Sequence, residues 1–262
     1  HRRRHSFPTR RSSDLSLPPS ASAAVQLVRK GRIDEALPLV QAELAKQPNN
    51  VALLHFSAFC KGKLGRHADA IADASAAIAI DPRHASSYGE RAYCLFHLGK
   101  MTEALRDFDK SIELDPANAM VHGERGDTLL ELGRHRQAIA AYDQAIRLLP
   151  KWPNPHSQRG RAALALCDFE LARASFTRAH ELDPDDGFAL FQLAGAQFDC
   201  RFDDEALATA KKLARAAGES RALALSGRLA WQLDRFDLAK QDLAKAVQTG
   251  SGPELLDARL SL

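Results

Sequence analysis

A 34-residue period runs through most of the sequence and limits the possible folds more than any other feature. Three sets of residues recur at this step: prolines, alanines, and a second set of small residues. The sets are Pro48, Pro82, Pro116, Pro150 and Pro184; Ala36, Ala70, Ala104, Ala138, Ala172 and Ala206; and Ala24, Ala58, Ala92, Gly126, Gly160 and Ala194. Because three registers share one period, we interpret the chain as an array of structural repeats.

One unit, residues 85–118, predicts the structure of the repeat. It contains two apolar-periodic segments of helical length, residues 86–98 and 102–114, separated by Gly99 and Lys100. A glycine suits this turn because the end of the first helix favours a left-handed backbone. The pattern therefore predicts a helix hairpin.

The small residues and the proline of this unit have mechanical roles. Ala92 and Ala104 fall in the two different helices, where a small side chain lets the two backbones approach closely. Pro116 cannot continue the second helix. Asn118, like Asn50 and Asp186 in other units, is then placed to cap the next helix.

These residues resemble the tetratricopeptide repeat family, whose 34-residue unit has small residues, an aromatic residue and a terminal proline at the same positions. The aromatic residue is present as Phe108, Tyr142 and Phe176, whereas the family's tryptophan near the start of the first helix is absent. The resemblance covers most of the chain. It implies an all-α fold, a right-handed α-α solenoid (superhelix) of about seven helix-turn-helix units.

The domain organisation follows from the repeat. We expect the solenoid to occupy residues 17–252. Its units are 17–50, 51–84, 85–118, 119–152, 153–186, 187–219 and 220–252. Residues 253–262 would form a short C-terminal capping helix or tail, and residues 1–15 a disordered leader.

The leader is interpreted as non-native. Residues 5–15, HSFPTRRSSDL, resemble the translation of a sequencing adapter, so we expect the true N-terminus to be missing. Residues 1–15 hold five arginines and one aspartate, a net charge of +4, and the whole chain carries +3, which leaves −1 on the remainder. The basic charge therefore gives no argument for a nucleic-acid or anionic-membrane partner.

The cysteines and histidines do not form a metal or redox motif. The cysteines, Cys60, Cys94, Cys167 and Cys200, are expected to be free thiols in or near the packing, which suits a reducing compartment and a cytoplasmic protein. His122 and His156 are repeat-equivalent, but no nearby ligand motif completes a metal site. We expect no metal and no cofactor.

The sequence also lacks a catalytic constellation, and we expect no enzymatic activity in this chain. There is no nucleophile elbow, no glycine-rich phosphate loop and no run of about 20 apolar residues that would span a membrane. Three repeat-equivalent arginines, Arg91, Arg125 and Arg159, are expected to pack between helices and to pair with acids such as Asp107 or Glu124.

Function is expected on the surface of the first helices, which line the concave face in the family. The resemblance places a peptide-binding surface there that is aromatic, then acidic, then aromatic and basic along the chain. Its residues are Phe56, Phe59, Glu90, Tyr93, Glu124, Asp127, Arg161, Phe188, Phe191 and Arg228. The acidic middle predicts a protein or peptide ligand with basic residues.

We interpret the chain as a non-catalytic protein–protein interaction scaffold, an adaptor that holds an extended peptide or a partner helix. Two alternatives stay open. The repeats could belong to a larger enzyme, such as a glycosyl- or sulfotransferase, whose catalytic domain was lost. They could also form an envelope or assembly subunit that associates with copies of itself.

Overall fold

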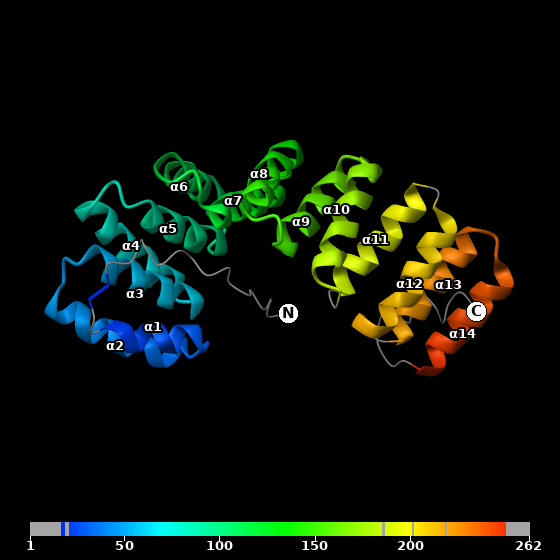
Figure 1. Ribbon diagram of the computed structural model, residues 1–262, viewed down its shortest axis with the longest axis horizontal. Helices are drawn as coiled ribbons and strands as arrows, with labels where there is room; N and C mark the ends of the chain where they lie inside the picture. Colours follow the sequence, from blue (N-terminus) through cyan, green and yellow to red (C-terminus); the bar gives the residue numbers. More distant parts are fainter. Residues whose placement is uncertain (1–16, 19–20, 185–186, 201, 218, 250–262) are drawn as a thin grey trace. The chain divides into compact units, whose positions relative to one another are not determined.

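The computed structural model describes residues 17–18, 21–184, 187–200, 202–217 and 219–249. The described residues form fourteen α-helices and no β-strand (Figure 1), which confirms the all-α fold class. The expected leader, residues 1–15, and the expected C-terminal cap, residues 253–262, lie outside the described residues. The chain divides into two compact units, His1–Arg134 and His135–Leu262, called unit 1 and unit 2 below.

Unit 1 contains seven of the described helices. They are α1 (Ser22–Arg29), α2 (Ile33–Lys46), α3 (Val51–Lys63), α4 (His67–Ile80), α5 (Ala85–His97), α6 (Met101–Leu114) and α7 (Ala119–Glu131). Consecutive helices pack as hairpins, α1 with α2, α3 with α4 and α5 with α6, and α5 also contacts α3 and α7. Three first helices, α3, α5 and α7, are thus neighbours within unit 1.

Unit 2 contains the other seven. They are α8 (His135–Leu148), α9 (Pro153–Ala165), α10 (Phe169–Leu182), α11 (Gly187–Asp199), α12 (Asp203–Ala217), α13 (Glu219–Gln232) and α14 (Phe236–Thr249). Hairpins form between α9 and α10, α11 and α12, and α13 and α14, while α8 packs on α9.

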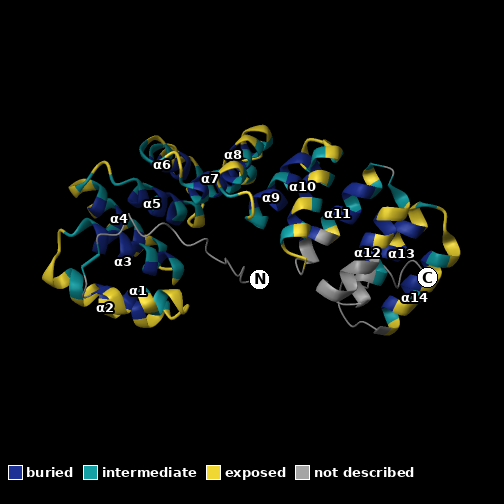
Figure 2. Ribbon diagram, viewed as in Figure 1, coloured by how far each residue is buried: buried dark blue, intermediate teal, exposed yellow. Residues whose placement is uncertain are grey.

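The core is a series of small clusters between successive hairpins. In unit 1, Ala58, Ala70 and Ala74 of the α3–α4 hairpin pack with Cys94 of α5, all without solvent exposure. Figure 2 shows the resulting contrast between α3, which is buried along most of its length, and α2, where exposed residues predominate. Burial of apolar surface between neighbouring hairpins stabilises such a repeat array.

The helix caps expected from the sequence are present. The Asn50 side chain accepts a hydrogen bond from the backbone N–H of Leu53 at 3.1 Å, and Asn118 accepts one from Val121 at 3.4 Å. Each bond satisfies a backbone donor that the first turn of a helix leaves open. Both caps are confirmed, whereas Asp186 lies outside the described residues.

Several of the described hairpin turns use a left-handed residue. Gly99 has a φ of 76°, and the N–H of Lys100 donates to the carbonyl of Leu95 at 2.9 Å, the pattern of a Schellman motif. Cys167 and Asp234 hold the same place in later hairpins with φ of 58° and 57°. The sequence interpretation placed Cys167 in or near the packing, but it is exposed because it occupies this turn.

We predict that Cys167→Gly stabilises unit 2 by about 0.5–1 kcal/mol, because glycine adopts a left-handed backbone at lower cost than cysteine. Urea unfolding measures the change. Cys167→Ala is the matched control, since alanine keeps the backbone strain. An equal gain from Cys167→Ala would show that the strain is not the cause.

The second register of small residues marks close helix–helix contact. In the α9–α10 hairpin, a Cβ atom added to Gly160 would lie 2.8 Å from the Cζ atom of Phe176. Phe176 is fully buried, so its ring cannot move into solvent to make room. Gly195 of α11, by contrast, has nothing within 4 Å of the same hypothetical atom.

Gly160→Ala should therefore destabilise unit 2 by about 1–3 kcal/mol through overpacking. Gly195→Ala is the matched control and should stabilise it by up to about 1 kcal/mol, because glycine in a helix costs conformational entropy. Thermal unfolding of the two single variants tests the pair. The close-contact interpretation fails if both substitutions shift the midpoint in the same direction.

The repeated arginines connect second helices of neighbouring hairpins. Arg91 of α5 makes two hydrogen bonds to the Asp107 carboxylate of α6, at 2.6 and 2.8 Å, and a third to Ser75 of α4 at 3.3 Å. The expected pair with Asp107 is confirmed. The arginine thereby joins its own hairpin to the preceding one.

Arg159 in unit 2 makes the same kind of link. Its guanidinium donates to Ser175 of its own hairpin at 3.0 Å and to Asp143 of α8 at 2.8 Å. Arg125 in unit 1 donates to Asp109 of α6, an acid of a second helix, at 2.7 Å. Residues 16 positions apart meet because α5 packs against α4 and α6, α7 against α6, and α9 against α8 and α10.

Candidate partner-binding surfaces

An aromatic pair lies on the first helices of unit 1. Phe59 of α3 and Tyr93 of α5 are both half-buried. The ammonium nitrogen of Lys63, at the end of α3, lies 4.2 Å from the centre of the Tyr93 ring and 5.6 Å from the centre of the Phe59 ring. The Phe59 and Tyr93 rings, called the aromatic clamp below, hold this lysine in a cation–π arrangement.

Carboxylates from two helices act on this clamp. Burial is the main reason why the pKa of Tyr93 is raised, and the charges of Glu124 and Glu90 raise it further. Glu90 is only 5% exposed and lies so close to α3 that a Cβ atom on Gly62 would be 2.8 Å from its Oε1 atom. Glu90 is therefore buried below the surface, and it affects Tyr93 through its charge.

The two buried thiols are not nucleophiles at neutral pH. Burial raises the pKa of Cys60 and of Cys94 to about 12 each, and the Glu90 charge adds to both shifts. A thiolate is the reactive form of cysteine, so these side chains act as small apolar groups in the packing.

Two histidines extend the aromatic clamp toward the hairpin turns. The His67 and His97 rings stack at 4.8 Å, and the edge of His97 meets Tyr93 at 4.4 Å between ring centres. Burial, then the Lys63 charge, lowers the pKa of His67. The ring therefore tends to be neutral at pH 7 and adds flat apolar surface next to Tyr93.

The residues of unit 1 that were expected to bind a peptide differ in how deeply they are buried. Phe59, Tyr93, Glu124 and Asp127 are half-buried and reach the surface. Phe56 is 4% exposed and packs in the cluster with Val40 and Cys60, so it lies in the core. The family resemblance placed Phe56 on the correct helix, but its depth of burial depends on packing against α2, which the sequence of α3 alone does not describe.

The expected residues of unit 2 lie on three helices. Arg161 of α9 is half-buried and donates to the Gln158 side chain at 3.0 Å. Phe191 of α11 is 41% exposed. The side chain of Phe188 lies outside the described part of the structure. Arg228 of α13 is exposed and lines a pocket.

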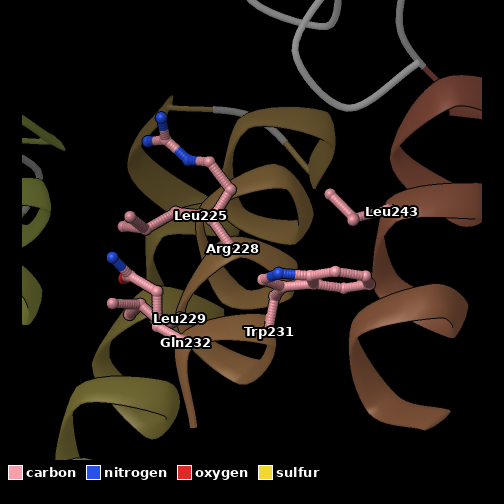
Figure 3. A pocket seen from close by; sticks show the side chains of 6 residues that line it. All are labelled: Leu225, Arg228, Leu229, Trp231, Gln232 and Leu243. Carbon is pink, nitrogen blue, oxygen red and sulfur yellow. The ribbon is translucent and has the colours of Figure 1, made fainter. Parts of the chain in front are cut away.

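This pocket of about 260 Å³ is formed by α13 and α14 (Figure 3). Its lining residues are Leu225, Arg228, Leu229, Trp231, Gln232 and Leu243. Three buried leucines form its apolar part, and in Figure 3 the Trp231 ring extends toward α14, which carries Leu243. Cofactor pockets commonly measure about 300–1,000 Å³, so the volume is small for a cofactor.

Two exposed aromatic residues, Trp231 of the pocket lining and its neighbour Phe236, were missed in the sequence interpretation. Trp231 is 52% and Phe236 51% exposed, and their rings meet edge to face at 5.2 Å. The relevant pattern was present in the sequence, because tryptophan and arginine are the side chains most enriched among binding anchors, and both occur within four residues of α13.

The two repeat-equivalent histidines support the junctions between hairpins. His122 hydrogen-bonds through Nε2 to the carbonyl of Pro116 at 3.0 Å, and His156 likewise to Pro150 at 3.2 Å. Each ring therefore donates to a carbonyl at the end of the preceding helix. Burial lowers the pKa of His156, and the bond to Pro150 offsets this shift in part.

This depressed pKa predicts a pH-dependent stability. The unfolded chain takes up the His156 proton near pH 6.5, about its ordinary pKa, whereas the folded chain resists it. The free energy of unfolding should thus fall as the pH drops below about 6.5. His156→Gln keeps an N–H donor without titrating, so urea unfolding should show a weaker loss between about pH 7.5 and about pH 5.5. An unchanged slope would assign the effect to other groups.

The residues that the structure describes hold no group of three or more His, Cys, Asp or Glu side chains arranged to bind a metal ion. In the same part of the chain, no helix has the length and apolar character needed to cross a membrane.

The helix hairpins and their surfaces define a repeat scaffold of the protein-interaction class. Three models of the tetratricopeptide repeat match the chain, over residues 83–151, 153–186 and 220–249, which together make up just over half of it. The chain therefore belongs to the tetratricopeptide repeat family. No curated protein matches it significantly.

Solved structures share the fold. The C-terminal part of a TPR repeat-containing protein from Cytophaga hutchinsonii matches with a TM-score of 0.71 and 17% identity, over 91% of this chain and 98% of that chain. PilW, a widely conserved type IV pilus biogenesis factor, matches with a TM-score of 0.65 and 20% identity, over 80% and 98%. YrrB, a TPR protein with an unusual peptide-binding site, matches with a TM-score of 0.63 and 23% identity, over 72% and 98%.

Proposed function

We propose that this chain is a non-catalytic adaptor that holds an extended peptide or a partner helix on the surfaces of its first helices. The observation that carries the proposal is the aromatic clamp of unit 1 with Glu124 and Asp127 on the neighbouring helix α7. Membership of a family of interaction repeats supports it. The likeness in fold to YrrB, which has a peptide-binding site, is consistent with it.

The unit 1 surface favours a ligand with basic residues. Glu124 and Asp127 are three residues apart, so their side chains project from the same face of α7. The charge of Glu124 reaches Tyr93 on α5, where it contributes to the raised pKa. A partner with Lys or Arg would meet a negative potential beside two aromatic rings.

The pocket of unit 2 favours an apolar anchor. Its buried leucines can receive one apolar side chain, while Trp231 and Phe236 provide exposed aromatic surface beside it. Aromatic residues at such places contribute much of the binding energy in protein complexes. We propose that unit 2 supplies a second contact of its own, with Arg228 at its edge.

Reversing the acidic residues of α7 should slow binding of a basic ligand. We predict that the double variant Glu124→Lys, Asp127→Lys lowers the association rate of short arginine-containing peptides and weakens its salt dependence, because electrostatic attraction steers the encounter. Surface plasmon resonance with peptides that differ only in Arg, Gln or Glu at their centre measures this.

The matched control reverses two glutamates of a second helix in the same unit, Glu103→Lys and Glu113→Lys on α6. Both glutamates are exposed, and they pair with Lys100 and Lys110 near the two ends of α6. The control variant therefore changes the net charge by the same amount as the test variant and leaves the first helices unaltered. Equal slowing by control and test variants would show a general charge effect and would contradict the proposed surface.

We place the adaptor in the cytoplasm because its two buried cysteines are free thiols, which suit a reducing compartment. A second candidate is an assembly role in the cell envelope, which the likeness in fold to a pilus biogenesis factor favours. Fractionation of cells that express the intact gene separates the two. Light scattering at two concentrations tests the accompanying proposal of self-association.

A further inference from the structure

Lys63 makes a contact that a partner's side chain would be expected to make. The last turn of α3 carries two lysines, Lys61 and Lys63. Lys61 forms an ion pair with Asp73 of α4, within its own hairpin. Lys63 reaches to the next hairpin, with its ammonium 4.2 Å from the Tyr93 ring centre.

The surroundings of Lys63 are built to favour a cation. Phe59 and Tyr93 present aromatic rings from two helices to the same ammonium group. Burial is the largest cause of the raised pKa of Tyr93, and the charges of Glu124 and Glu90 raise it further. Carboxylates of α7 and α5 thus act on the residue whose ring Lys63 contacts. This arrangement is complementary to an ammonium or guanidinium group.

Lys63 can leave the clamp without unfolding α3. It is the last residue of that helix, next to the exposed Leu64 and to Gly65, which has a left-handed φ of 78°. A lysine side chain is a flexible four-carbon stem, so its ammonium group can move into water. The contact therefore has the properties of a reversible one.

We infer that Lys63 is a built-in competitor, which occupies the site that a partner's Lys or Arg side chain takes in the complex. The inference rests on the proposed function, because it concerns the same surface of unit 1. A partner then binds only the fraction of molecules in which Lys63 has left the clamp, so the apparent affinity falls by that fraction. The site selects partners whose cation is held better than Lys63, and a guanidinium stacks on aromatic rings more readily than an ammonium does.

The test removes the competing charge and keeps the stem. Lys63→Met should tighten binding of a short peptide with one central arginine among glycine and serine residues. A single cation–π contact corresponds to about a two- to thirty-fold change in affinity, which sets the expected gain. A second peptide with citrulline in place of arginine has nearly the same shape and no charge, and its weaker binding should change little.

Lys100→Met is the matched control. Lys100 lies in the turn after α5, its side chain is 54% exposed, and it pairs with Glu103. Lys100→Met removes one positive charge, as Lys63→Met does, but from a lysine that pairs with Glu103. An equal gain from both variants would reduce the effect to net charge and would overturn the inference.

A double-mutant cycle with Tyr93 adds a readout that a purely structural lysine would not change. In a Tyr93→Leu background, Lys63→Met should no longer tighten arginine-peptide binding, because the ring for which both cations compete is gone. In NMR spectra of the wild-type protein, the Lys63 Cε protons over the Tyr93 ring should move toward their ordinary shifts when the peptide is added. Circular dichroism melts of each variant confirm folding before binding is compared.

The outcomes distinguish the inference from the proposed function. Weaker arginine-peptide binding by Lys63→Met would mean that Lys63 itself contacts the partner, which overturns the inference while the peptide-binding surface stands. No binding by either wild type or Lys63→Met also overturns it. If, in addition, no member of the peptide panel responds to changes at Glu124 and Asp127, the proposed function fails as well.

Discussion

The close approach of helices at the small-residue positions is the constraint on which the other features depend. A Cβ atom on Gly160 would lie 2.8 Å from Phe176, and one on Gly227 would lie 2.7 Å from Leu243. In both hairpins the large residue of the second helix fills the space that the glycine leaves. In these two hairpins a small residue of the first helix and a large residue of the second therefore fit each other, and their contact fixes how closely the two helices approach.

Hydrogen bonds from the repeated arginines link each of their hairpins to the preceding one. Arg91 holds Asp107 of its own hairpin and Ser75 of the preceding one, whereas Arg159 holds Ser175 and Asp143 in the same two directions. These guanidinium groups are largely covered, so they remain paired instead of binding a ligand. The outward positions of the first helices take no part in these arginine contacts between hairpins.

The sequence predicted the helices and their ends well because those features depend on local chemistry. The glycine turns and the caps at Asn50 and Asn118 each need only a few adjacent residues. The depth of a side chain depends on neighbouring helices, and there the prediction was less complete. Phe56 and Glu90 lie on the expected helices but are covered, while the exposed Trp231 was overlooked because its exposure depends on how α13 and α14 pack. Cys167 shows that even a turn position tolerates an unexpected residue at moderate strain.

Residues that depart from the period identify candidates for function even in a single sequence. The ninth position of successive units holds Phe59, Tyr93, Asp127 and Arg161, while the eighth position holds only alanine or glycine in the same units. Adjacent positions on one helix face different surroundings: the small residue faces the partner helix of its hairpin, and the next residue reaches the surface. Packing thus fixes the eighth position and leaves the ninth open to change. The packing of the hairpins therefore does not dictate the sequence of aromatic, acidic and basic groups along the ninth position.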